Sequence, residues 1–293
     1  MKLLLTGAHG QVGQEIAALA QQSDCSLLAL DRTALDITDP QAVRIAVNAF
    51  RPNVTINAAA FTAVDLAESQ PSQAFAVNRD GPAHLAAACA AIDCPLIHLS
   101  TDYVFDGSSP TPYTETDPAA PIGVYGQSKY DGEEAIRTLW SRHLIVRVSW
   151  VFGFHGRNFV KTMLRLAREK ETLAVVRDQW GGPTPADAIA DTLLTLARRI
   201  ATEPTFQEWG TYHYCGEPGV SWHEFAAFII AQARQRIPLA VQEIRGITTA
   251  EYPTPARRPA NSRLDCQQIA TRLGIAPADW QQAVHILMPR LLP

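Results

Sequence analysis

The first half of the chain alternates short apolar runs with longer segments in which apolar residues recur at helical spacing. Strands separated by helices are typical of parallel β-α-β units, and continuously apolar strands suit a sheet that is covered on both faces. The predicted strands are residues 2–6, 26–30, 54–59, 96–100 and 144–150, and the predicted helices are residues 10–21, 40–50, 71–89 and 125–139. The pattern therefore predicts an α/β fold with a doubly wound parallel sheet.

The texture of the chain changes after about residue 153. Proline and glycine cluster at residues 181–185 and 252–259, and a strand-like stretch covers residues 210–215. Ser221 followed by Glu224 forms a capping-box sequence at the start of an apolar helix. We expect a sheet domain over residues 1–153 and a smaller C-terminal lobe over residues 154–293, with later segments able to return to the sheet domain.

Composition and charge exclude several classes of function. The chain has 293 residues with 25 Lys and Arg against 29 Asp and Glu, so its net charge of −4 offers no basic field for nucleic acid. No apolar run approaches the roughly 18 residues of a membrane span, and no signal peptide is expected. Five cysteines without metal-type spacing indicate reduced thiols. Together these features predict a cytoplasmic protein.

Three glycines follow the first predicted strand at a G-x-x-G-x-x-G spacing, namely Gly7, Gly10 and Gly13. Glycine permits a tight turn and lets backbone N–H groups approach a pyrophosphate, which the positive end of the following helix also favours. An ordinary strand-to-helix turn is the alternative. The position between a strand and a helix at the start of the chain favours a dinucleotide site, and hence a Rossmann-type, dinucleotide-binding domain.

Polar and small residues at the next strand ends are candidates for cofactor contacts. Asp31 would accept hydrogen bonds from an adenosine ribose, whereas Arg32 would pair with a 2′-phosphate, so NADH and NADPH both stay open. Asp36 and Ile37 are expected at the end of a further strand, near the adenine, although a helix cap suits Asp36 equally. The small side chains of residues 57–60 leave room for a cofactor, or simply pack well.

Tyr125 and Lys129 lie four residues apart in a predicted helix and therefore on one face. An ammonium beside a phenol favours the phenolate, so Lys129 is expected to lower the pKa of Tyr125 and make it a proton donor near neutral pH. Ser100 and Thr101 lie at the end of a strand where open α/β sheets bind ligands, and one of these hydroxyls can hydrogen-bond a substrate oxygen and stabilise charge that develops on it. A surface ion-dipole pair and a strand-end cap are the alternatives. The combination with the glycine-rich turn favours catalysis.

These features together resemble the extended short-chain dehydrogenase/reductase superfamily and, within it, the dTDP-4-dehydrorhamnose reductase family. The resemblance runs through nearly the whole chain. The further matching segments are residues 57–60, 62–65, 100–105, 124–126, 149–151, 161–167, 253–255, 258–259 and 261–264. It implies reduction of the C4 ketone of a dTDP-linked 4-dehydro-6-deoxy-L-mannose to dTDP-L-rhamnose by NADPH or NADH, with the C-terminal lobe binding the nucleotide sugar.

The resemblance also implies roles for individual residues. Thr101, Tyr125 and Lys129 form the catalytic trio, in which Tyr125 gives its proton to the alkoxide and Lys129 holds the nicotinamide ribose. The residues expected to bind the cofactor, from the motifs and the resemblance together, are Gly7, Gly10, Gln11, Val12, Gly13, Asp31, Arg32, Asp36, Ile37, Ala58, Ala59, Ala60, Phe61, Thr62, Tyr125 and Lys129. The residues expected to bind the substrate are Thr101, Asp102, Trp150, Asn158, Gln179 and Arg258.

Some members of this family bind Mg²⁺ through carboxylates at a dimer interface. Glu15 matches one ligand position, Asp187 replaces a Glu at another, and Arg290 stands where a third carboxylate is expected. Because a guanidinium repels a hard cation that needs oxygen ligands, we expect neither the metal nor that particular dimer. A homodimer stays open.

Two alternatives to a reductase remain. One is a nucleotide-sugar dehydratase or epimerase of the same superfamily. Dehydratases there carry an acidic pair after the Ser-Thr segment, whereas here Asp102 is followed by Tyr103. The other is a non-catalytic regulatory subunit resembling the methionine adenosyltransferase β-subunit. The complete set of Thr101, Tyr125 and Lys129 favours an enzyme, since a pure binding protein does not need a proton donor.

Overall fold

The computed structural model describes residues 1–22 and 24–292, and its centre is a six-stranded parallel sheet. The spatial order of the strands is β10-β5-β4-β3-β1-β2, so the chain winds outward in both directions from a switch point between β1 and β3. Ligands of open α/β sheets bind at such a point, beyond the carboxyl ends of the strands. The strands are β1 (Lys2–Thr6), β2 (Ser26–Leu30), β3 (Val54–Asn57), β4 (Leu96–Thr101), β5 (His143–Val148) and β10 (Gly210–His213).

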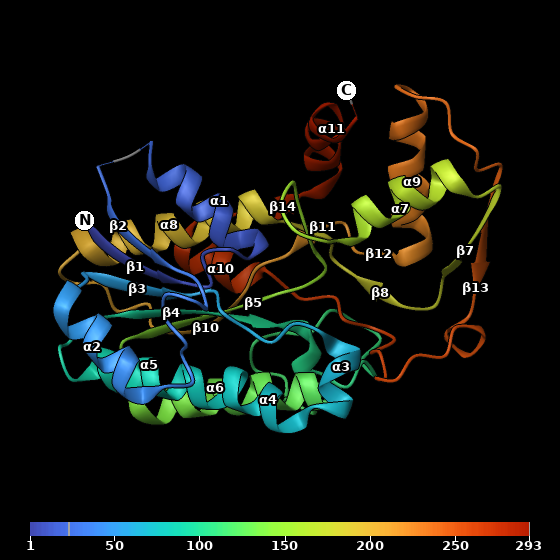
Figure 1. Ribbon diagram of the computed structural model, residues 1–293. Helices are drawn as coiled ribbons and strands as arrows, with labels where there is room; N and C mark the ends of the chain where they lie inside the picture. Colours follow the sequence, from blue (N-terminus) through green and yellow to red (C-terminus); the bar gives the residue numbers. More distant parts are fainter. Residues whose placement is uncertain (23, 293) are drawn as a thin grey trace.

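Helices cover both faces of this sheet (Figure 1). On one face lie α1 (Gln11–Ala20), α8 (Ala186–Thr202) and α10 (Gln267–Leu273). On the other lie α2 (Pro40–Phe50), α5 (Gly81–Ala90) and α6 (Val124–Leu139), preceded by α3 (Val64–Ser69), α4 (Pro71–Phe75) and the π-helical turn η1 (Ala76–Asp80). Because both faces are covered, strands such as β1 are apolar along almost their whole length, with Leu3, Leu4 and Leu5 fully buried.

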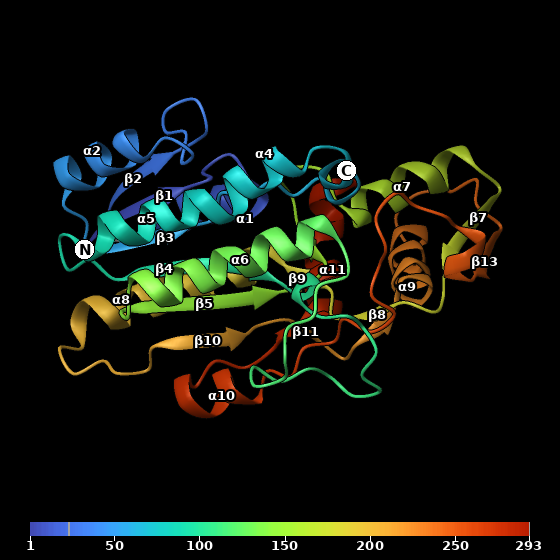
Figure 2. The ribbon, with the colours of Figure 1, turned by 90° about the horizontal axis from the view of Figure 1, so that it is seen from below.

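A second layer of structure stands beside the carboxyl ends of the strands (Figure 2). Its helices are α7 (Phe159–Glu169), α9 (Trp222–Arg234) and α11 (Trp280–Leu291), and its longer strands are β7 (Thr172–Val176) and β13 (Glu243–Ile247), which pair in parallel. The short elements are η2 (Asp102–Val104), β6 (Val151–Phe152), β8 (Trp180–Gly181), β9 (Thr184–Pro185), β11 (Gly216–Glu217), β12 (Val220–Ser221), η3 (Thr249–Glu251) and β14 (Ala278–Asp279). This lobe has its own hydrophobic core around Phe225, Ile229 and Trp280.

The α/β fold with a doubly wound, Rossmann-type parallel sheet is confirmed. The sixth strand, β10, comes from the second half of the chain and pairs with β5. The predicted helix over residues 71–89 is one run broken by the π-turn η1 into α4 and α5. The capping box of Ser221 and Glu224 is present at α9. Among the described helices, none has the length and apolar character to cross a bilayer.

The prediction of a strand ending at Asp36 and Ile37 is wrong. Residues 31–39 form two consecutive turns instead. Asp31 accepts hydrogen bonds from the backbone and hydroxyl of Thr33, and Asp36 does the same with Thr38. Aspartate side chains that bond the backbone two residues on compete with strand formation, and β2 is therefore the edge of the sheet.

Candidate active site

The glycine-rich turn between β1 and α1 is pressed against the end of β3. Gly7 has a φ of +76°, and a Cβ on it would lie 2.5 Å from the carbonyl carbon of Ala58. A Cβ on Gly13 would lie 2.2 Å from the carbonyl oxygen of Gly7. Gly10 is the N-cap of α1 and supplies no side chain to bond the first N–H groups of the helix. These N–H groups at the positive end of the helix fit the pyrophosphate of a dinucleotide.

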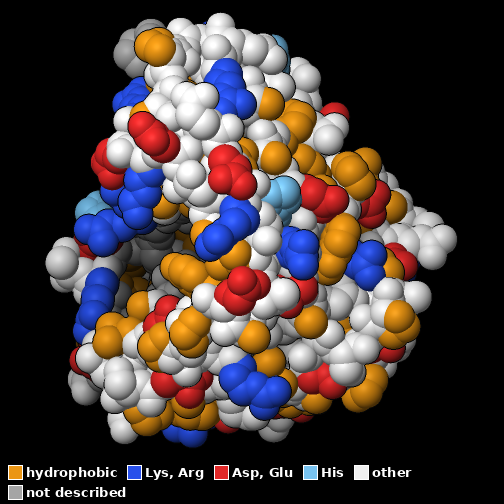
Figure 3. Space-filling model, turned by 90° about the vertical axis from the view of Figure 1, so that its right-hand side faces the viewer, with side chains coloured by type: hydrophobic (Ala, Val, Ile, Leu, Met, Phe, Trp, Pro, Cys, Tyr) orange, Lys and Arg blue, Asp and Glu red, His pale blue; other side chains and the backbone are white. Residues whose placement is uncertain are grey.

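A cavity of about 730 Å³ opens in front of this turn and extends to the ends of β4 and β5. It brings together most of the residues predicted from sequence. Those that line it are Gly7, Gly10, Gln11, Val12, Gly13, Asp31, Arg32, Asp36, Ile37, Ala58, Ala59, Ala60, Phe61, Thr62, Thr101, Asp102, Tyr125, Lys129 and Trp150. Its volume lies in the range of ligand-binding pockets. Figure 3 shows a hollow in the molecular surface with Lys and Arg side chains at its rim.

Asp31 has two sets of partners at the adenosine end of the cavity. One carboxylate oxygen accepts bonds from Thr33 and from the backbone N–H of Ala34, and the other lies 2.9 Å from Nδ1 of His9 in the glycine-rich turn. The hydroxyl of Thr33 and the N–H of Ala34 hold the pKa of Asp31 below its usual value. The carboxylate is thus kept ionised at the position where a ribose hydroxyl is expected.

Thr101 and Asp102 lie side by side at the carboxyl end of β4. The hydroxyl of Thr101 donates to Asp102 at 3.0 Å and accepts from the backbone N–H of Tyr103. Asp102 is 2% exposed, and its Oδ2 has no hydrogen-bond partner among the described residues. Burial raises the pKa of Asp102 to about 6, against the opposing effect of the hydroxyls of Ser262 and Thr101. A buried acceptor without a partner, in a residue that lines a cavity, is consistent with a polar ligand group nearby.

The phenol of Tyr125 is buried near the start of α6, edge-on to the ring of Tyr103 at a centroid distance of 5.3 Å. Burial raises its pKa to about 12, although the nearby hydroxyl of Thr101 acts in the opposite direction. The prediction that Lys129 lowers the pKa of Tyr125 is therefore wrong for the protein without its ligands. Lys129 is not among the groups that shift this pKa, because its amine contacts Leu99 and His98 instead.

Lys129 lies one helical turn after Tyr125 and is 2% exposed. Its Nζ donates to the carbonyl oxygen of Leu99 at 2.8 Å and lies 3.2 Å from Nε2 of His98. Burial lowers the pKa of Lys129 to about 8, while the carboxylate of Glu133 opposes this shift. The amine thus contacts two residues of β4, and Lys129 also lines the cavity.

Trp150 stands in the loop after β5 with a φ of +47°, a left-handed conformation that a bulky residue rarely adopts. Its ring stacks on Trp222 at a centroid distance of 3.4 Å and an angle of 6°. The indole also fills the space next to Gly181, where a Cβ would lie 2.3 Å from its Cε2 atom. Backbone strain that surrounding contacts maintain is typical of a functional position.

Asn158, Gln179 and Arg258 lie outside the residues that line the cavity. Asn158 caps α7 and donates to the side-chain oxygen of Gln11 at 3.0 Å. Gln179 donates to the hydroxyl of Thr249, and Arg258 pairs with Asp65 at 2.9 Å. Their roles in substrate binding stay predictions.

Sequence reasoning did not assign several lining residues to the site, and Arg157, His9 and Tyr103 are among the polar ones. His9 is an unspecified position of the glycine motif, and Arg157 lies in a loop without periodicity, so neither gives a pattern. His98 was missed for another reason. It lies in the interior of an apolar strand, where a histidine carries no positional signal.

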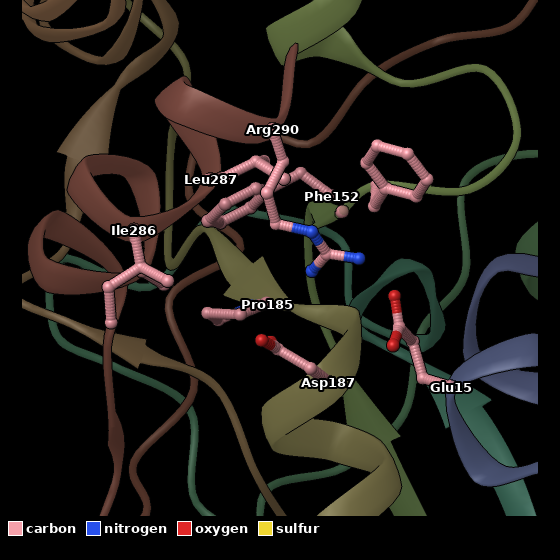
Figure 4. A pocket seen from close by; sticks show the side chains of 10 residues that line it. Glu15, Phe152, Pro185, Asp187, Ile286, Leu287 and Arg290 are labelled. Carbon is pink, nitrogen blue, oxygen red and sulfur yellow. The ribbon is translucent and has the colours of Figure 1, made fainter. Parts of the chain in front are cut away.

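A second, small pocket is lined by residues of α1, α8 and α11 and of the loop around Phe154 (Figure 4). The guanidinium of Arg290 points between the carboxylates of Glu15 and Asp187, and it lies over the ring of Phe154 at 4.4 Å. Within the described part of the chain, no three His, Cys, Asp or Glu side chains cluster as a metal site.

Comparison with known proteins assigns this arrangement to a family. The family model described as "RmlD substrate binding domain" matches residues 1–292. A dTDP-4-dehydrorhamnose reductase of Aggregatibacter actinomycetemcomitans is 47% identical over 285 residues, which is 97% of each chain.

Two solved structures of the same name are similar over 99% of both chains. The dTDP-4-dehydrorhamnose reductase of Clostridium acetobutylicum has 35% identity and a TM-score of 0.92. That of Bacillus anthracis, solved in complex with NADP, has 33% identity and a TM-score of 0.91.

Proposed function

This chain belongs to the RmlD substrate binding domain family, and it is similar over nearly its whole length to dTDP-4-dehydrorhamnose reductases. We propose that it reduces dTDP-4-dehydrorhamnose. The reaction converts the C4 ketone of dTDP-4-dehydro-6-deoxy-L-mannose to the alcohol of dTDP-L-rhamnose, with NADPH or NADH as reductant. The observation that carries the proposal is the presence of Thr101, Tyr125 and Lys129 on one wall of the cavity whose other wall is the glycine-rich turn.

The turn and the strand ends would hold the cofactor. Gly7, Gly10 and Gly13 leave the N–H groups of α1 open to the pyrophosphate, and Asp31 and Arg32 lie at the adenosine end. When bound, the nicotinamide supplies the hydride for the ketone carbon. Asp31 is ionised and favours ribose hydroxyls, whereas Arg32 favours a 2′-phosphate, so the two residues still point to different coenzymes.

Tyr125 is proposed as the proton donor. With its pKa raised to about 12, the phenol is protonated at neutral pH, as an acid must be. A sugar alkoxide is a much stronger base than a phenolate, so transfer of this proton is favourable. The hydroxyl of Thr101 would donate to the carbonyl oxygen, and Asp102, whose Oδ2 is free in the described structure, would accept from a sugar hydroxyl.

The lobe beside the strand ends would bind the nucleotide sugar. Trp150 presents an indole that suits the apolar face of a deoxy sugar, and Asn158, Gln179 and Arg258 stay candidates for the nucleotide end. A guanidinium such as that of Arg258 matches diphosphate geometry, provided that it can leave Asp65. Basic side chains at the rim of the hollow in Figure 3 favour an anionic ligand.

The first test supplies dTDP-4-dehydrorhamnose with NADPH or NADH and follows the nicotinamide absorbance. Stoichiometric oxidation of the added coenzyme is expected. An epimerase or dehydratase recycles its coenzyme and would show sugar conversion without it. A flat trace with folded protein and both coenzymes would exclude the reductase.

The second test is Tyr125→Phe, which removes only the donated proton. The kcat is expected to fall at least about 100-fold, the usual contribution of a positioned acid, while coenzyme binding is retained. A regulatory subunit would keep its biological activity in this variant.

We further propose a cytoplasmic location, supported by five free thiols, and a homodimer as the assembly to test.

A further inference from the structure

A chain of buried polar side chains runs beneath the candidate site, from β1 across β3 and β4 to α6. The hydroxyl of Thr6 donates to Oδ1 of Asn57 at 2.7 Å, and Nδ2 of Asn57 lies 3.0 Å from Nδ1 of His98. Nε2 of His98 then lies 3.2 Å from Nζ of Lys129. All four side chains are at most 2% exposed, so no bulk water can rearrange their hydrogen bonds.

Asn57 determines which atoms donate and which accept in this row of hydrogen bonds. Its Oδ1 accepts from the hydroxyl of Thr6 and also from the backbone N–H of Ala59 at 3.1 Å. Two donors on one atom identify that atom as the oxygen, so the amide nitrogen faces His98. An amide nitrogen can only donate, and Nδ1 of His98 must therefore accept and carry no proton.

The tautomer of His98 follows from this direction. Burial, followed by the charge of Lys129, holds the pKa of His98 well below its usual range, so the ring is neutral. A neutral imidazole carries one proton, which must reside on Nε2 when Nδ1 accepts. The Nε2–H group of His98 therefore points at the amine of Lys129.

An ammonium has three donors and no acceptor, so it cannot accept this hydrogen bond. A neutral amine can accept from His98 while it donates to the carbonyl oxygen of Leu99. We propose that His98 is a positioning residue that stabilises Lys129 as a neutral amine in the ligand-free enzyme, and that Lys129 acts as an ammonium only after its Nζ turns away from Nε2. The catalytic role of the ammonium rests on the proposed function. The contact between His98 and the amine of Lys129 does not.

The other charged groups near Lys129 do not overrule this contact. Glu133, one turn further along α6, is the facing anion, but its carboxylate is bound by Arg147 at 2.6 Å and by Arg137 at 2.8 Å. Arg137 adds positive charge on the side of His98, whereas His143 on β5 is neutral because burial lowers its pKa. Tyr125 is a neutral phenol. The environment as a whole therefore stabilises the amine relative to the ammonium, in agreement with a pKa of Lys129 that is lowered to about 8.

The decisive experiment uses the ligand-free protein and does not depend on activity. Long-range ¹⁵N NMR of the histidine rings distinguishes a protonated Nε2 from a protonated Nδ1, with His98 assigned by substitution. We expect Nε2 of His98 to carry the proton across the neutral range. A protonated Nδ1 would overturn the proposal, because Nε2 would then accept from an ammonium.

A titration of the lysines provides the second readout. The chain has only four lysines, so ¹³Cε labelling gives four signals, of which that of Lys129 is identified by substitution. In His98→Gln the side-chain oxygen can turn toward Nζ and accept, and the midpoint of Lys129 is expected to rise by about one pH unit, a tenfold change in the ratio of amine to ammonium. An unchanged midpoint would contradict the proposal.

The matched control is His143→Gln, a buried histidine on β5 whose ring bonds the carbonyl oxygen of Trp140 rather than a lysine. It should leave the midpoint of Lys129 in place. In the reductase assay, His98→Gln is expected to move the alkaline limb of the pH profile of kcat to higher pH. A purely structural role would instead lower kcat equally at every pH. If the NMR results hold but no reductase activity exists, the proposed function fails and the inference about Lys129 stands.

Discussion

At the scale of single residues, Asp102 combines a functional position with an unfavourable environment. Its carboxyl is buried, its Oδ2 has no partner among the described residues, and its pKa rises from 3.8 to about 6. A group whose pKa is raised in the folded state stabilises the fold below its unfolded pKa, and this contribution is lost as the pH rises through the folded value. Ionised Asp102 therefore destabilises the protein at neutral and alkaline pH.

We predict that Asp102→Asn raises the thermal stability of the ligand-free protein at pH 8 and has little effect at pH 4. The rise of about two pKa units corresponds to about 3 kcal/mol. Thermal unfolding at the two pH values measures it. The matched control is Asp106→Asn, since bonds from Ser108 and Tyr113 lower the pKa of Asp106 and its loss should destabilise the protein at pH 8. A lower melting temperature for Asp102→Asn at pH 8 would contradict the interpretation.

A second residue-scale prediction concerns Gly181, which leaves the space that Trp150 occupies. In Gly181→Ala the new Cβ would overlap the indole, and the stack on Trp222 prevents the ring from retreating on that side. The ring must then shift toward the cavity. We expect the KM for the sugar nucleotide to rise about tenfold, with little change in the KM for the coenzyme.

The double variant tests whether this effect acts through Trp150. In a Trp150→Phe background the smaller ring leaves room for the alanine, so Gly181→Ala should have no further effect on KM. Such non-additivity is the sign of residues that act through direct contact. Equal effects of Gly181→Ala in both backgrounds would show that the glycine acts on the loop instead.

The sequence predicts some of these residues and not others, for a physical reason. Gly7 and Gly13 are predictable because only glycine satisfies their close approaches, and Tyr125 and Lys129 because helical spacing puts them on one face. The raised pKa of Tyr125 is not predictable in this way. It depends on burial, and the residues that contact the amine of Lys129, His98 and Leu99, lie on a different element.

At the scale of elements, α6 carries both Tyr125 and Lys129 and is fixed to the sheet by a buried ion pair. Glu133 accepts two bonds from Arg147 on β5, at 2.9 and 2.6 Å, and one from the hydroxyl of Ser100 on β4 at 2.5 Å. Burial would raise the pKa of Glu133, but Arg147 and the other donors outweigh it and lower the pKa overall. The helix is thereby held in register with the strand end that bears Thr101.

Removal of one partner of this pair should be strongly destabilising. Glu133→Gln leaves Arg147 charged and buried without its anion, and we expect a loss of about 3–5 kcal/mol in the free energy of unfolding. Urea unfolding measures it, with Glu169→Gln at the exposed pair with Arg165 as the control, where less than about 0.5 kcal/mol is expected. Equal losses in the two variants would show that the buried pair does not fix the helix.

Elements with strong periodicity agree with their predictions, whereas those decided by local side-chain bonds do not. α2 matches residues 40–50, in which the buried Val43 and Val47 recur at helical spacing and Asp39 caps the start. The strand expected at Asp36 fails because Asp31 and Asp36 bond their own turns. The break of the helix at η1, between residues 75 and 81, has no counterpart in the predicted apolar pattern.

At the scale of the whole molecule, the carboxyl ends of the strands face a lobe with a separate core, and the cavity lies where the two meet. The positions of β10 and α8 in the first layer depend on contacts between residues far apart in sequence. Tyr212 on β10 is fully buried, and Ile189 and Leu193 on α8 pack in the same cluster as Ile16. Local periodicity does not indicate such long-range pairing. The sequence therefore predicts the layers but not which later segments complete them.

The last prediction concerns assembly and the small pocket of Figure 4. The guanidinium of Arg290 points toward the carboxylates of Glu15 and Asp187, and its positive charge disfavours a divalent cation, which needs oxygen ligands. We therefore expect the mass of the protein, measured by light scattering after size exclusion, to be the same with excess MgCl₂ and with EDTA.

The variant Arg290→Glu replaces the positive charge with a carboxylate. It should bind Mg²⁺ measurably by calorimetry, since two carboxylates would then be joined by a third. If the native protein increases in mass on addition of Mg²⁺, the charge of Arg290 does not control this surface, and the carboxylates of Glu15 and Asp187 must recruit the metal with help from a second copy of the chain.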